Sequence, residues 1–159
     1  MSKFTISDEN IRQIFHNLCE LTLPKSEWTH DAHLAAAVAI LSDPRFKALK
    51  DMPQIIKNYN EATGVQNTDN DGYHHTITFA SLYAVKSILD EGNLTLSETF
   101  HKLLNSEFGR SKWPLSYWSS DRLFSSSARK TWVEPDLKKL PFKTHSDHDP
   151  LNEGTSKIT

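Results

Sequence analysis

The chain has 159 residues, a formal net charge of −2 and an apolar content of 37%, which is enough for one hydrophobic core because a chain of about 150 residues buries roughly 70% of its unfolded surface. This charge excludes a general attraction to nucleic acid or to anionic lipid, and the single Cys19 excludes an intramolecular disulfide. No apolar run approaches the ~20 residues of a membrane span, and residues 1–10 contain no apolar leader. The sequence therefore predicts a cytoplasmic protein without a membrane or nucleic-acid partner.

Helix-start and helix-stop signals divide residues 7–108 into five segments. Ser7, followed by acidic residues, starts the first helix, and Leu23-Pro24 ends it. Thr95 and Glu98 match a capping box, which starts the fifth. The second contains five alanines, which favour a central position because neighbours can approach closely from several sides. The predicted helices cover residues 7–24, 26 or 29–41, 43–63 with a break or kink at Pro53, 73–90 and 95–108.

The sequence changes character beyond Trp113-Pro114. Residues 119–124 and 125–132 are predicted to form short helices with serine caps, and the aromatic residues around them indicate packing against the bundle. After Pro141 the chain is polar, so we predict a disordered tail over residues 141–159. The predicted fold is all-α: a single helical domain over residues 1–140, with about five main helices and a C-terminal cap of short helices.

Three histidines are predicted to face inward from two helix starts. At about 100° per residue, His30 and His33 continue the buried stripe of the second helix, and His74 lies on the inward face of the fourth. If the first four helices alternate in direction, the second and fourth run parallel with their N-termini at the same end. The three histidines would then lie together.

Three interpretations of this cluster remain open. It could be a hydrogen-bonded network that orders the helix ends. It could be a divalent metal site with three imidazole ligands and an open position, in which zinc, iron, nickel and copper are not distinguishable. It could also be a metal-free pocket whose histidines bind or protonate a substrate, where two converging helix N-termini would favour an anionic ligand.

Other residues could support chemistry at this cluster. Tyr73 and His75 are candidates for proton transfer because they flank His74. Arg122 and Arg129 could bind an anionic group of a small-molecule substrate. No phosphate-binding loop and no dinucleotide fingerprint is present, so the sequence predicts no nucleotide cofactor.

The chain contains the motifs Thr29-His30-x-x-His33-Leu34, Tyr59-Asn60, Gly72-Tyr73-His74-x-Thr76-x-Thr78, Ser120-x-Arg122-Leu123, Ala128-Arg129 and Val133-x-Pro135-Asp136-Leu137. Together they resemble those of a family of small, uncharacterised bacterial proteins, over about residues 28–140. The resemblance implies that the histidines and both arginines belong to the family pattern, but it implies no activity. Members usually carry Glu where this chain has His75, so any role of that carboxylate in the family is in doubt for this chain.

The function favoured by the sequence is a small-molecule enzyme. Its metal would be held by His30, His33 and His74, and would activate water or polarise the substrate. The alternative is a non-catalytic domain that binds a ligand or a protein partner, with the histidines as a structural network. Burial of the tryptophans after residue 112 would favour the first, and partial exposure would favour a partner surface.

Overall fold

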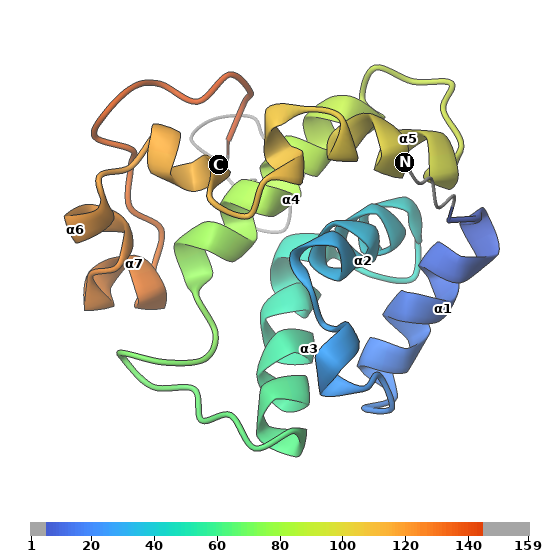
Figure 1. Ribbon diagram of the computed structural model, residues 1–159, viewed down its shortest axis with the longest axis horizontal. Helices are drawn as coiled ribbons and strands as arrows, with labels where there is room; N and C mark the ends of the chain where they lie inside the picture. The colour runs from blue at the N-terminus through green and yellow to red at the C-terminus, as the bar shows by residue number, and fades with distance from the viewer. Residues whose placement is uncertain (1–5, 145–159) are drawn as a thin grey trace, which may run out of the picture.

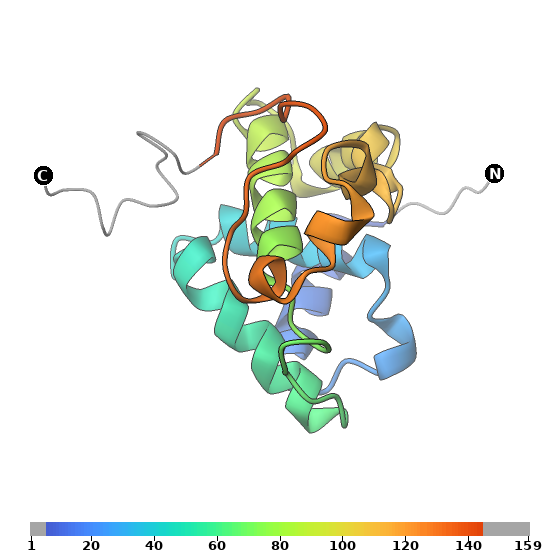
Figure 2. The same ribbon diagram turned by 90° about the vertical axis from the view of Figure 1, so that its left-hand side faces the viewer.

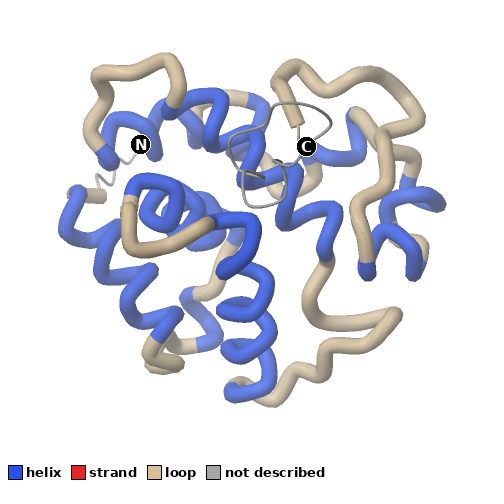
Figure 3. The backbone as a smooth tube through the Cα atoms, turned by 180° about the vertical axis from the view of Figure 1, so that it is seen from behind, coloured by secondary structure: helices blue, strands red, loops and turns tan. Residues whose placement is uncertain are grey.

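The computed structural model describes residues 6–144, which form helices, turns and loops without any strand (Figures 1 and 3). The predicted all-α fold, with five main helices and short C-terminal helices, is confirmed. Most of the predicted disordered tail lies outside the described residues. The helices are α1 (Asp8–Cys19), α2 (His30–Ser42), α3 (Ala48–Ala62), α4 (His75–Leu89), α5 (Leu96–Leu104), α6 (Ser120–Leu123) and α7 (Ser126–Lys130), and short 3-10 turns cover Lys25–Glu27, Glu107–Gly109 and Trp113–Ser116.

Capping residues set several of the helix ends. Ser7 and Thr95 form the capping boxes that begin α1 and α5. The α3 helix begins at Ala48 rather than at Asp43, because the Asp43 carboxylate accepts hydrogen bonds from the Arg45 backbone at 3.0 Å and from its guanidinium at 2.7 Å. This local turn competes with helix formation. The α3 helix then continues through Pro53 as far as Ala62.

The α2 helix is the centre of the fold. It contacts α1, α3, α4 and α5, and its residues from Leu34 to Ile40 are all buried. The small side chains of this segment allow the neighbouring helices to approach closely. Figures 1 and 2 show α2 crossing α4 rather than running beside it, so the predicted parallel arrangement of these two helices is wrong.

The C-terminal third is attached to the bundle by side-chain hydrogen bonds to its backbone. The buried Thr76 hydroxyl donates to Thr131 O at 2.8 Å and accepts from the Val133 N–H at 3.2 Å. Trp118 is fully buried, and its indole N–H donates to Val133 O at 3.0 Å. Figure 2 shows the segment after α7 running along α4. We call residues 113–140 the C-terminal cap.

Two of the three cap tryptophans belong to the core. Trp113 and Trp118 are buried, while Trp132 is half-buried. Trp132 packs edge-on against Trp118 and against Tyr83 of α4. Most of the aromatic surface of the cap is therefore used within the fold. None of the helices described between residues 6 and 144 has both the length and the apolar character needed to span a membrane.

Candidate functional site

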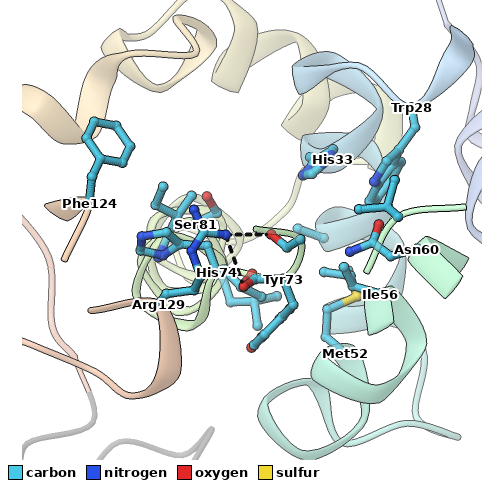
Figure 4. Close-up of a pocket in the computed structure, with 16 residues that line it drawn as sticks. Trp28, His33, Met52, Ile56, Asn60, Tyr73, His74, Ser81, Phe124 and Arg129 are labelled. Atoms are coloured by element: carbon cyan, nitrogen blue, oxygen red, sulfur yellow. Dashed lines mark hydrogen bonds between the residues drawn. The ribbon is translucent and has the colours of Figure 1, made fainter. Parts of the chain in front are cut away.

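A cavity of about 450 Å³ lies between α2 and α3 on one side and the start of α4 and the cap on the other. Figure 4 shows Trp28, His33 and Asn60 on one wall, and His74 and Arg129 on the facing wall. Its volume is within the range of small-molecule sites. The lining residues, mostly apolar, are Trp28, His33, Ala37, Met52, Ile56, Asn60, Val65, Gly72, Tyr73, His74, Ile77, Thr78, Ser81, Leu82, Phe124 and Arg129.

Both ring nitrogens of His74 have partners within the protein. His74 is the N-cap of α4, and its Nδ1 accepts the Ile77 N–H at 3.1 Å. Its Nε2 therefore carries the proton and donates to Leu123 O at 2.7 Å. Desolvation lowers the pKa of His74, and the nearby Arg129 charge lowers it further. The ring is thus a neutral cap that ties α4 to α6, and it has no free lone pair for a metal.

His30 is also engaged by a backbone carbonyl. Its Nε2 lies 2.8 Å from Phe108 O, which joins the first residue of α2 to the turn after α5. No group of three or more His, Cys, Asp or Glu side chains within residues 6–144 is arranged to hold a metal ion. The predicted metal centre at His30, His33 and His74, and the metal-dependent enzyme built on it, is therefore wrong. Two of its three rings are committed to carbonyl groups, and His33 and His74 lie on facing walls of the cavity (Figure 4).

His33 differs from the other two because its ring nitrogens make no hydrogen bond to any residue that the structure describes. The ring stacks on Trp28, with centroids 3.7 Å apart and planes inclined by 26°, and its side chain is exposed at the pocket wall. Desolvation by the surrounding protein, with a smaller contribution from His30, lowers the pKa of His33 to about 4. His33 is therefore neutral near pH 7. Because pocket water still reaches the ring, this shift contributes less to stability than its size alone suggests.

Arg129 supplies the positive charge of the pocket. Its Nη1 donates to Gly72 O at 2.9 Å and more weakly to Tyr73 O at 3.4 Å. In the part of the chain that the structure describes, no carboxylate pairs with it, and Nε and Nη2 have no hydrogen-bond partner. Arg129 is half-buried. It is a fixed cation with donors left over for a ligand.

The carbonyl groups that hold Arg129 belong to a loop organised by one amide. Asn67 Oδ1 accepts from Asn60 Nδ2 and from the Tyr73 N–H, both at 2.9 Å, and Asn67 Nδ2 donates to Lys57 O at 3.1 Å. These three bonds fix residues 67–73 against α3. Arg129, which bonds to the carbonyl groups of residues 72 and 73, is thereby tied to α3 through this loop.

The remaining predicted site residues lie in different places. The Tyr73 ring lines the pocket, and its hydroxyl shares a 3.0 Å hydrogen bond with His75 Nδ1, while burial raises the pKa of Tyr73. His75 is not a lining residue and stacks on Phe79. Arg122 is exposed, lies outside the pocket, and donates from Nε to Glu134 O at 2.6 Å. Proton transfer by Tyr73 or His75 stays a prediction, and only one of the two arginines faces the cavity.

Sequence reasoning missed several lining residues. Trp28 lies between the two predicted starts of the second helix, residues 26 and 29, and Phe124 is an exposed aromatic side chain in the cap. Asn60 was visible only as part of the Tyr59-Asn60 motif. A buried asparagine at the end of an amphipathic helix is a signal that could have been used, because a buried amide needs partners.

His33 and His74 line the pocket and have lowered pKa values, so we expect the folded protein to lose stability in acid. For His33 the folded-state pKa of about 4 lies below the ordinary value of 6.5, so between these values the unfolded chain binds the proton and the folded chain does not. This contribution to stability is fully present above pH 6.5 and is lost as the pH falls toward 4. We expect the Tm to fall over this interval, and to fall less steeply in His33→Phe. An equal slope in the variant would show that the ring is fully solvated in the folded protein.

The chain matches no family model, no curated protein and no solved structure. The resemblance to small bacterial proteins therefore receives no support from these comparisons.

Proposed function

We propose that the protein binds a small, largely apolar molecule with one anionic group, without a metal, in the pocket between α2, α3, α4 and the cap. The observation that carries this proposal is Arg129: a guanidinium anchored by the Gly72 and Tyr73 carbonyls, with free donors at the cavity and no carboxylate partner among residues 6–144. Burial of a charge at a largely apolar cavity is unfavourable, and an anionic ligand would offset this cost by pairing with Arg129.

The rest of the lining supports the same class of ligand. It contains no Asp or Glu, so no negative charge opposes an anion. Met52, Ile56, Ile77 and Leu82 provide an apolar interior, where burial of hydrocarbon contributes about 25 cal/mol per Å². A monocarboxylate with an aliphatic or aromatic body satisfies both conditions.

The test is calorimetric titration of the full chain with octanoate and phenylacetate, each compared with its neutral amide. We expect the carboxylates to bind and the amides to bind at least about tenfold more weakly, because a hydrogen bond to a charged group contributes roughly 1.5–3 kcal/mol. In the Arg129→Gln variant, each carboxylate and its amide should bind with the same affinity. Trp28 lines the pocket, so its fluorescence provides an independent signal of occupancy.

Arg122→Gln is the matched control. It removes an arginine from the same cap, but from outside the pocket, so the preference for carboxylates should persist. The proposal fails if none of the four compounds binds, or if both arginine variants reduce carboxylate binding equally.

A further inference from the structure

The wall that faces Arg129 contains two hydrogen-bonding groups with unused capacity. The first is His33, whose ring nitrogens have no hydrogen-bond partner among residues 6–144. Its stacking on Trp28 fixes the plane of the ring. A neutral imidazole offers one N–H donor and one nitrogen acceptor, and the lowered pKa of His33 keeps it in this form near pH 7.

The second group is the side-chain amide of Asn60. Asn67 Nδ2 donates to Lys57 O, so Asn67 Oδ1 is the acceptor for Asn60 Nδ2 at 2.9 Å. This arrangement sets which end of each amide is the nitrogen. Asn60 Oδ1 then has no donor among the described residues, and Asn60 lines the pocket on the same side as His33 (Figure 4).

The donors and acceptors of this wall select among ligand groups. A second carboxylate only accepts hydrogen bonds, so it could accept from the His33 N–H but would leave Asn60 Oδ1 without a donor. An ammonium only donates, so it would leave the His33 N–H unpaired, and it would add a positive charge to a pocket that already holds Arg129. A hydroxyl both donates and accepts. It can accept from His33 and donate to Asn60.

We infer that His33 and Asn60 recognise an uncharged hydroxyl at the far end of the ligand, so that the pocket is specific for a hydroxylated carboxylic acid. This inference rests on the proposed anion binding at Arg129. The ligand would extend across the apolar interior with its carboxylate at one wall and its hydroxyl at the other.

The experiment compares ω-hydroxy acids with unsubstituted fatty acids over a series of chain lengths from butyrate to decanoate. Affinities are measured by calorimetry on the full chain. At the length that spans the cavity, the hydroxy acid should bind about tenfold more tightly than its parent, the effect expected of two neutral hydrogen bonds. At other lengths it should bind more weakly, because a hydroxyl buried without partners opposes binding.

Variants at His33 test whether the preference for hydroxy acids arises at the wall formed by His33 and Asn60. His33→Phe retains an aromatic ring to stack on Trp28 but has no nitrogen, so the ratio of hydroxy-acid to parent affinity should fall to one or below. His33→Gln should keep part of the preference, and Arg122→Gln should keep all of it. Circular dichroism and the Tm show whether each variant is folded.

The possible outcomes separate the two proposals. If unsubstituted acids bind through Arg129 and no hydroxy acid is preferred at any length, this inference is wrong while the anion site stands. If His33→Phe retains the full preference, the hydroxyl is not recognised here, and the inference is also wrong. If no acid of either series binds, the anion site fails and this inference fails with it.

Discussion

Replacing Gly72 by alanine is expected to destabilise the protein by roughly 2–4 kcal/mol. Gly72 has a φ of +80°, a conformation that L residues rarely adopt. An added Cβ would lie 2.4 Å from Gln66 O and 2.7 Å from Asn67 Oδ1. The first contact is with backbone, and the second is with the amide that organises the loop, so neither can move without breaking the hydrogen bonds of Asn67.

Gly64 provides the matched control for this substitution. Its φ is +89°, but an added Cβ would meet nothing within 4 Å, so Gly64→Ala should lose only about 1 kcal/mol from backbone strain. Urea denaturation, monitored by circular dichroism, measures the free energy of unfolding of both variants. Similar losses in the two variants would show that residues 66–67 do not pack around Gly72 as described. Gly72→Ala should also weaken ligand binding, because the carbonyl of residue 72 anchors Arg129.

Trp118→Ala is expected to destabilise the protein by about 3–5 kcal/mol, the usual range for removing a fully buried tryptophan. The indole is inaccessible to solvent, packs on Trp132, and donates to Val133 O. Its removal would leave a cavity and an unpaired carbonyl beneath the cap. Because the same cap contains Arg129, the variant should lose carboxylate binding along with stability.

Phe124→Ala is the control for Trp118→Ala. Phe124 is also an aromatic residue of the cap, but it is 56% exposed, so its removal should change the free energy of unfolding by less than about 1 kcal/mol. Chemical denaturation with tryptophan fluorescence distinguishes the two variants. A small effect of Trp118→Ala would mean that the cap is not docked on the bundle through this side chain.

The sequence predicted the helices well because their signals are local. Ser7, Thr29 and Thr95 are N-caps in the structure, as their positions before amphipathic runs indicated. At Asp43 and near residue 104 the helix bounds differ from the prediction because a side chain binds nearby backbone. Asp43 accepts from the Arg45 N–H, and the Ser106 hydroxyl donates to Leu103 O at 2.7 Å and accepts from the Phe108 N–H at 3.1 Å. Such competition depends on the geometry of individual side chains, and the spacing of apolar residues in the sequence does not reveal that geometry.

The pocket was predictable only in part. The inward positions of His33 and His74 on two helices could be derived from helical periodicity, and both residues line the cavity. The hydrogen-bonding state of His74 could not be derived in this way, because its partner is a carbonyl group 49 residues away in the cap. The angle between α2 and α4 also depends on how closely small side chains let the helices approach, and the prediction of a shared metal depended on that angle.

The bond between Arg129 and the carbonyl of residue 72 joins parts of the chain that are 57 residues apart. One guanidinium thus lines the cavity and ties the cap to the loop before α4, so we expect binding of the proposed ligand and docking of the cap to be thermodynamically linked. A ligand that binds only while the cap is docked stabilises the docked form by RT ln(1 + [L]/Kd), about 2.7 kcal/mol at a hundredfold excess over Kd. The ligand proposed above would therefore protect the C-terminal third from proteolysis to the extent that it occupies the pocket.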